Sequence, residues 1–402
     1  MPKEYSPFTP GVPVPLEFFV GREREITDIV THVKKSVALK TLERVFICGE
    51  RGIGKSSLCR AALRIAEEKE EVLGLHVFLG GVVSLQEMIR RIFERLLQES
   101  RDRNWYDGVK AFLGNNVREV GLFGISLKLD ASDRDLSQAV NDFAPTLRNL
   151  LSRLGQYRKG LMIVLDDLNG LAGSPPFANW LKSLVDEIAT AREPLPLTLV
   201  LVGLPDRRRE LTAVQPSLDR VFDLIEIQRF NEAETRQFYQ QAFEKVNVTV
   251  TPEALEELWR VSGGYPVFLH EIGDAIFKWD TDGRIDIDDA TVGVLSAAKV
   301  IGAKYIEPKV LEAIWSERYR GILKKIGIMW FSLEKKFSKA DLLKDLSPEE
   351  AKALNNFLQK MKQLNVIRQD PAMGRGRYEF TSELYGLFFW LQATAEEKGP
   401  PR

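Results

Sequence analysis

Apolar residues in the first half of the chain gather into short uninterrupted runs, which longer amphipathic segments separate. A fully apolar run is typical of a central parallel strand, because helices bury both of its faces. In the amphipathic segments, apolar residues recur every three or four positions, which predicts helices. The expected strands cover residues 44–48, 74–80, 161–165, 197–204 and 224–227. One helix is expected to end at about residue 37. The other expected helices cover residues 56–69, 84–98, 135–154 and 177–192. This alternation predicts an α/β fold with a parallel sheet in a three-layer core.

The pattern changes after residue 231, where helices follow one another without a buried strand. Three helices are expected over 232–246, 252–262 and 266–278, followed by a connection over 280–306 with a helix after residue 288. The last hundred residues predict helices over 308–326, 338–343 and 348–364, then strands over 366–369 and 377–380. A chain of 402 residues is too long for one core. We therefore predict an α/β core over 1–228, an all-α region over 229–300 and a small domain over 301–402.

Two segments depart from this regular pattern. Residues 5–15 are rich in proline, cannot form a helix and are expected to form an extended arm on the domain surface. Residues 121–129 alternate partly between apolar and polar, which predicts a β-hairpin. This hairpin would either offer a partner surface or fill an edge of the domain.

A stretch that fits the pattern G-x-x-x-x-G-K-[ST] joins the first strand to the following helix. Its glycines let backbone N–H groups curl around a phosphate, and the helix start adds free amides and a positive dipole end. Lys55 can reach the β- and γ-phosphates, and the Ser56 hydroxyl can ligate Mg²⁺. The residues expected to bind nucleotide here are Gly49, Glu50, Arg51, Gly52, Ile53, Gly54, Lys55, Ser56 and Ser57. The alternative, a glycine-rich turn that matches by chance, is disfavoured by the flanking strand and helix.

Two aspartates end the third apolar run. They fall at the carboxyl edge of the predicted sheet, where ligands bind in open α/β folds. Asp166 is expected to hold Mg²⁺ through its water shell, as a Walker B aspartate does, and Asp167 follows it directly. The alternative is a strand that simply ends in a polar turn.

Composition narrows the range of functions. The formal net charge is -1, so nucleic acid could contact only a local basic patch. The two cysteines, Cys48 and Cys59, make neither a disulfide framework nor a zinc-ligand set, and we therefore expect a reducing cytoplasm. No apolar run approaches the length of a membrane span, and the N-terminus does not have the form of a signal peptide.

Upstream of the phosphate loop, Phe19 and Val20 precede the sequence Gly-Arg-Glu-x-Glu at residues 21–25. This order resembles the signal-transduction ATPases with numerous domains (STAND class) and their relatives, the archaeal-type and origin-recognition-like AAA+ ATPases. The resemblance implies that Phe19, Val20 and Arg22 form part of the adenine pocket. A capped helix start with a buried phenylalanine is the alternative. Farther along, residues 264–266 resemble the Gly-x-Pro of STAND ATPases, which implies that Pro266 lies against the adenine from a helical lid.

The same resemblance implies two catalytic roles besides that of Lys55. Asp167 occupies the position of the glutamate that polarises the attacking water in many AAA+ proteins, and an aspartate is one methylene shorter. Arg220 is placed like the arginine that reaches into a neighbouring subunit's ATP, and a surface pairing with Asp219 or Asp223 is the alternative. Where relatives carry a polar residue that senses the γ-phosphate, this chain has Gly-Leu-Pro at 203–205, so that role is not transferred.

The last hundred residues resemble a winged helix, a variant of the helix-turn-helix. The basic residues suited to DNA on this domain are Arg368, Arg375, Arg377, Lys352 and Lys360. Glu349 and Glu350 oppose this role, because they stand at the start of the helix that would meet DNA. A protein-interaction module is the alternative.

The sequence therefore predicts an ATP-binding protein and Mg²⁺-dependent ATPase that acts as a nucleotide-controlled switch, either as a homo-oligomer or with an unknown protein partner. One alternative is a DNA-binding initiator or regulator that uses ATP as a licence. Another is an adaptor that holds ADP and hydrolyses little. The chain has no Asn-Lys-x-Asp motif for reading guanine, which favours adenine.

Overall fold

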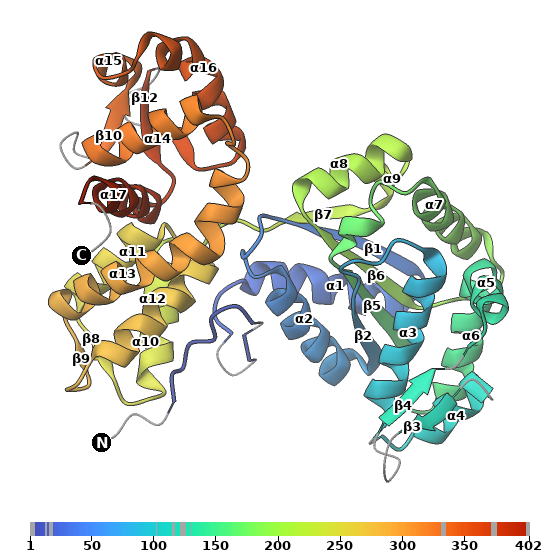
Figure 1. Cartoon of the computed structure of the whole chain (residues 1–402). Helices are drawn as coiled ribbons and strands as arrows, with labels where there is room; N and C mark the ends of the chain where they lie inside the picture. Colours follow the sequence, from blue (N-terminus) through green and yellow to red (C-terminus); the bar gives the residue numbers. More distant parts are fainter. Residues whose placement is uncertain are drawn as a thin grey trace. The chain divides into compact units, whose positions relative to one another are not determined.

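A computed structural model gives the structure of the chain (Figure 1). It describes residues 5–12, 14–15, 19–101, 103–114, 117–120, 126–129, 131–330, 335–370 and 376–398. The chain divides into two compact units. The first is Pro13–Gln228, and the second combines Met1–Val12 with Arg229–Arg402.

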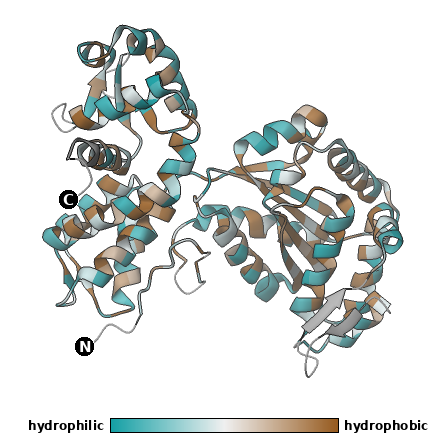
Figure 2. Cartoon of the chain, in the orientation of Figure 1, coloured by the Kyte–Doolittle hydropathy of each residue, from teal (hydrophilic) through white to brown (hydrophobic). Residues whose placement is uncertain are grey.

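A five-stranded sheet forms the centre of the first unit, in the order β2-β5-β6-β1-β7. All four neighbouring pairs are parallel. The strands are β1 (Leu42–Cys48), β2 (Val72–Phe78), β5 (Gly160–Asp166), β6 (Leu197–Gly203) and β7 (Asp223–Glu226). Their residues are predominantly hydrophobic (Figure 2). The predicted α/β class with a parallel sheet is thus confirmed.

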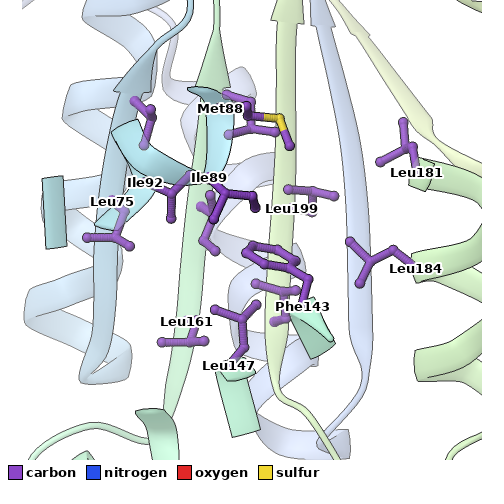
Figure 3. Close-up of a cluster of buried hydrophobic side chains, with 14 of the residues drawn as sticks. Leu75, Met88, Ile89, Ile92, Phe143, Leu147, Leu161, Leu181, Leu184 and Leu199 are labelled. Carbon is purple, nitrogen blue, oxygen red and sulfur yellow. The ribbon is translucent and has the colours of Figure 1, made fainter. Parts of the chain in front are cut away.

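Helices bury both faces of this sheet. On one face, α1 (Glu23–Leu39) brings Val37 against Gly160, and α2 (Lys55–Glu70) brings Leu63 against Gly74. The strand residues next to these glycines point to the opposite face, since side chains alternate along a strand. There, side chains of β2, β5 and β6 meet those of α3 (Leu85–Ser100), α6 (Phe143–Leu154) and α7 (Pro175–Thr190). Figure 3 shows this cluster, with Leu75, Leu161 and Leu199 from the strands and Met88, Ile89, Ile92, Phe143, Leu147, Leu181 and Leu184 from the helices. Burying one such side chain stabilises the fold by roughly 1.5–3 kcal/mol.

The helix predicted over 135–154 is wrong as a single element. The structure has α5 (Asp133–Asn141) and α6, separated at Asp142. Pro145 gives the reason, because it has no N–H to donate to Asn141 in a continuous helix, whereas the first turn of α6 does not need that donor. Among the described residues of the first unit, three α-helices were not predicted: α4 (Tyr106–Leu113), α8 (Pro205–Val214) and α9 (Leu218–Val221). Strands β3 (Val117–Val120) and β4 (Ser126–Leu129) pair antiparallel, and residues 121–125 of the predicted hairpin lie outside the described residues.

The second unit begins, as predicted, with a run of helices. They are α10 (Glu232–Glu244), α11 (Pro252–Ser262), α12 (Pro266–Trp279) and α13 (Ile287–Ile301). Two strands of two residues each, β8 (Thr249–Val250) and β9 (Arg284–Ile285), also pair here and were too short to predict. The helix expected over 308–326 is instead a π-helix over Gly302–Leu311 and a separate α14 (Glu317–Met329). Pro308 lies inside the π-helical turn, where an α-helical hydrogen bond from its nitrogen is impossible.

The C-terminal part contains the predicted helices α15 (Lys339–Leu343) and α16 (Pro348–Gln363). The predicted strands β11 (Ile367–Gln369) and β12 (Arg377–Phe380) are joined by β10 (Lys336–Ser338) in an antiparallel sheet of order β10-β12-β11. A last helix, α17 (Glu383–Lys398), was not predicted. It buries Leu384, Tyr385, Phe388 and Phe389, so apolar residues surround its first turns and weaken the alternation that marks an amphipathic helix.

The N-terminal arm is not a surface feature throughout. Phe8 is 4% exposed, and its ring packs against Phe238, Tyr239 and Phe243 of α10. The predicted surface position is therefore wrong for Phe8, because an aromatic side chain between prolines can be buried even where the backbone is extended. Within the described ranges, no helix has the length and apolar character that crossing a membrane requires.

Candidate functional site

The order of the strands marks one place at the carboxyl edge of the sheet. The chain leaves β1 for β2 at one edge, whereas it leaves β6 in the other direction and passes β1 to reach β7. In open α/β sheets, ligands bind at the carboxyl edge where the connections of two adjacent strands leave in opposite directions. The segment 49–54 leaves β1 at this point and enters α2.

The glycines of this loop adopt backbone angles that other residues rarely reach. Gly52 has φ of 78° and Gly54 has φ of 92°. A Cβ added to Gly54 would find no atom of the described residues within 4 Å, so the loop faces open space there. The N-cap residue of α2, Gly54, makes no side-chain capping hydrogen bond, and the first turn of the helix contains no acidic residue. The first amides of a helix have no partner within it, so this helix start is suited to binding an anion.

Lys55 lies within the curve of this loop. Its Nζ donates to the carbonyl oxygens of Gly49 at 2.9 Å and Glu50 at 2.7 Å. Burial lowers the pKa of Lys55, and the nearby charges of Asp166 and Asp167 oppose that shift without reversing it. The charges of the ammonium and the two carboxylates therefore interact. Ser57 is buried, and its hydroxyl accepts a hydrogen bond from the N–H of Val14 at 3.2 Å.

The two aspartates differ in their surroundings. Asp166 ends β5, is 3% exposed and accepts a hydrogen bond from His76 at 2.8 Å. Asp167 is half-buried and has left-handed backbone angles of φ 65° and ψ 66°. This conformation costs a non-glycine residue on the order of 1 kcal/mol, and aspartate is among the residues that tolerate it best. Gly80 leaves room for Asp167, whose Oδ2 would lie 3.0 Å from a Cβ at that position.

The residues expected in the adenine pocket lie at the entry to α1. Phe19 is half-buried and Val20 is buried. Arg22 is buried in a left-handed conformation, and its guanidinium donates to the backbone oxygen of Gln228 and to Glu25. The side chain of Arg22 makes no capping hydrogen bond at the start of α1. Pro266 is the first residue of α12 in the second unit, and its contact with adenine stays a prediction.

Arg220 is exposed on α9. Asp219 pairs with Arg208, and Asp223 faces His32 at 3.8 Å. Within the described residues, no ion pair joins Arg220 to either aspartate. The structure therefore gives no support to the surface pairing that the sequence left open.

Sequence reasoning missed two residues of this region. His76 was passed over, although a polar residue within the apolar strand β2 was a usable signal. Arg208 lies on α8 and lowers the pKa of Cys48, which burial and Glu226 raise more strongly. Its charge therefore acts at the end of β1, next to the loop. Nothing in the run of three arginines at 207–209 distinguished it from its neighbours.

The basic residues proposed for DNA contact differ in their availability. Lys352 and Arg377 are exposed and Lys360 is half-buried. Arg368 donates to Glu379 at 2.7 Å. Arg375 lies outside the described residues. The acidic residues at the start of α16 are both paired, Glu349 with Arg318 at 3.1 Å and Glu350 with Lys325 at 2.6 Å.

The first unit thus combines a parallel sheet, an open glycine-rich loop, a half-buried lysine and an acidic pair at one edge. Fold and site together define the class of the P-loop ATPases.

Comparison with known proteins identifies a domain within the first unit. Residues 19–202 match the AAA ATPase domain. The chain is similar to the ORC2 protein of Aeropyrum pernix, whose structure contains ADPNP and ADP, with 14% identity, a TM-score of 0.60 and coverage of 99% of this chain and 98% of that one. It is also similar to a Walker-type ATPase of Pyrococcus abyssi, with 18% identity, a TM-score of 0.55 and coverage of 92% and 96%. At these identities, the two likenesses show the fold. No curated protein matches the chain. The chain therefore carries an AAA ATPase domain and is a nucleotide-binding ATPase.

Proposed function

We propose that this ATPase is a nucleotide-controlled switch that binds ATP with Mg²⁺ at residues 49–57 and hydrolyses it slowly. The observation that carries the proposal is the position of Lys55. Its ammonium donates to two loop carbonyls at the start of α2, whose N-cap residue makes no side-chain capping bond, and Asp166 and Asp167 act on it electrostatically. A phosphate chain would satisfy all of these groups together.

The oxygen donors at this place fit Mg²⁺. The hydroxyl of Ser56 stands in the first turn of α2, and the carboxylate of Asp166 ends β5. Mg²⁺ prefers such hard oxygen ligands and keeps several waters. When bound, the ion would neutralise charge on the phosphates. Ser56 and Asp166 would hold it, while the loop amides and Lys55 would orient the phosphates.

Hydrolysis needs a group that orients water, and Asp167 has this role in our proposal. Its shorter side chain and the Gly-Leu-Pro segment at 203–205, in place of a polar sensor, both favour a low rate. Arg220 would act on the ATP of a second copy of the chain, which its exposure permits. Phe19, Val20 and Arg22 would form part of the adenine pocket.

The test compares nucleotide binding and turnover in the wild type, Lys55→Ala and Lys69→Ala. Lys69 is exposed near the end of the same helix, so its variant controls for loss of a lysine from α2. We expect Lys55→Ala to lower turnover about 100-fold or more, the usual cost of removing a charged group from a phosphoryl-transfer site. Lys69→Ala should match the wild type. An equal loss of turnover in both variants, or no loss in either, would contradict the proposed site.

Duplex DNA is a second candidate partner of the switch. The observation that favours it is the pairing of Glu349 and Glu350 with basic partners, which removes the repulsion expected at the start of α16. The same turnover assay with added duplex DNA decides whether the switch acts on DNA or on a protein partner. Turnover that rises with DNA, and no longer rises in Arg377→Glu, supports a DNA-linked ATPase. ADP retained through purification with negligible turnover supports an adaptor.

A further inference from the structure

His76 is a buried histidine on β2 that contacts the acidic end of β5. The ring is 4% exposed, and its Nε2 lies 2.8 Å from Oδ2 of Asp166. The ring also stacks on Phe78, with centroids 4.5 Å apart and planes 25° from parallel. Since β2 and β5 pair in parallel, the contact rests on two adjacent strands of the central sheet.

The direction of this hydrogen bond follows from its chemistry. A carboxylate can only accept, so Nε2 carries the proton and donates it. The other ring nitrogen, Nδ1, is buried and has no hydrogen-bond partner among the described residues. The contact with Asp166 is therefore the single hydrogen bond described for this ring.

Burial of a polar ring with one unpaired nitrogen is unfavourable, and an apolar side chain would fill the same volume without that cost. The other residues of β2 are apolar or glycine, so His76 is the one polar side chain of this strand. The gain from His76 must therefore come from what it does to Asp166. The segment that follows β2 also fixes the backbone of Asp166, because the carbonyl of Asp166 accepts a hydrogen bond from the N–H of Leu79 at 2.7 Å.

We propose that His76 is a positioning residue for Asp166. Its Nε2–H occupies Oδ2 and fixes the carboxylate, which leaves Oδ1 to interact with the water shell of Mg²⁺. Hydrogen bonds to ligating carboxylates commonly change metal affinity 10- to 100-fold. This inference rests on the proposed function, because it assigns His76 to the same metal site.

Two amide variants separate donation by the side chain from its packing. The amide nitrogen of glutamine in His76→Gln can take the place of Nε2, whereas that of asparagine in His76→Asn is too close to the backbone to reach Asp166. The readout is Mn²⁺ affinity in the presence of ADP, measured by electron paramagnetic resonance of free Mn²⁺. ADP affinity with a chelator present reports whether the loop is intact.

We expect His76→Asn to weaken Mn²⁺ binding about 10-fold or more, with metal-free ADP affinity within twofold of the wild type. His76→Gln should stay within about threefold of the wild type in both measurements. Equal Mn²⁺ affinity in the wild type and His76→Asn would overturn the inference, as would an equal loss in both amide variants.

A double variant covers the case in which a single change disturbs folding. If His76 acts through Asp166, adding His76→Asn to Asp166→Asn should weaken Mn²⁺ binding no further, since the partner is already altered. Additive losses would show an effect that does not pass through Asp166 and would overturn the inference. Failure of the wild type to bind ADP would instead contradict the proposed function, so the two failures are distinguishable.

Discussion

His270 shows how a single buried side chain can make folding depend on pH. It lies on α12 and is buried, and its Nδ1 accepts a hydrogen bond from the N–H of Thr9 at 3.2 Å. Burial lowers the pKa of His270 from 6.5 to about 4. Protonation would add a charge to an apolar environment and remove the acceptor that Thr9 uses.

The sign of the pH effect follows from these two values. Between pH 6.5 and about 4, the unfolded chain binds a proton at this residue and the folded chain does not. The stabilising contribution is therefore complete above pH 6.5 and decreases as the pH falls, by about 3 kcal/mol at the lower limit. We expect His270→Asn, which keeps an acceptor for Thr9 but does not titrate, to lose less stability than the wild type between pH 7 and pH 5. Urea unfolding at the two pH values measures this, and parallel losses in both proteins would contradict it.

At the scale of elements, strands and loop were predictable where the signal is local. The runs that form β1, β5 and β6 are apolar enough to predict burial by themselves. The phosphate-binding motif at 49–57 consists of consecutive residues, so it can be recognised without knowing the fold. The break between α5 and α6 was also visible in principle, because Pro145 is a local signal that helical periodicity overrode.

Contacts between distant residues were not predictable in this way. His76 and Asp166 are 90 positions apart, and their meeting depends on the register of β2 with β5. The charge of Arg208 acts at Cys48 only because β1 lies beside β6, after which α8 begins. The sequence contains both residues but not the sheet order that brings them together.

Two helical glycines offer a matched test of packing against helix propensity. Alanine normally stabilises a helix over glycine by about 1 kcal/mol. A Cβ at Gly293 of α13 would lie 2.2 Å from Cγ1 of Ile276 and 3.1 Å from its Cα, so α12 would have to move. A Cβ at Gly108 of α4 would meet Leu154 at an ordinary 3.6 Å. We expect Gly293→Ala to destabilise the protein by about 1–3 kcal/mol and Gly108→Ala to leave it equally or more stable. Thermal unfolding of the two variants checks this, and stabilisation by both would show that α13 adjusts freely.

At the scale of the whole molecule, the division into units does not follow the order of the sequence. The N-terminal twelve residues belong with residues 229–402, so the chain passes between the units at 12–13 and again at 228–229. The unit that contains α10 to α17 is therefore completed by the opposite end of the chain.

Phe8 makes this completion testable. The centroid of its ring lies 4.9 Å from that of Phe243 and 5.9 Å from that of Phe238. Gly273 of α12 leaves room for this ring, since a Cβ at that position would lie 2.4 Å from it. Replacing a buried phenylalanine by alanine costs about 3–5 kcal/mol, through lost burial and the cavity that remains. We expect Phe8→Ala to increase hydrogen exchange in α10 and α12 while exchange in β1 and β5 is unchanged. Tyr5→Ala is the control, because Tyr5 belongs to the same arm and is 65% exposed. If exchange in α10 and α12 is the same in Phe8→Ala as in Tyr5→Ala, the arm is not part of that unit's core. If it rises only in Phe8→Ala, any shortened form of this protein must keep its first twelve residues to keep its second unit stable.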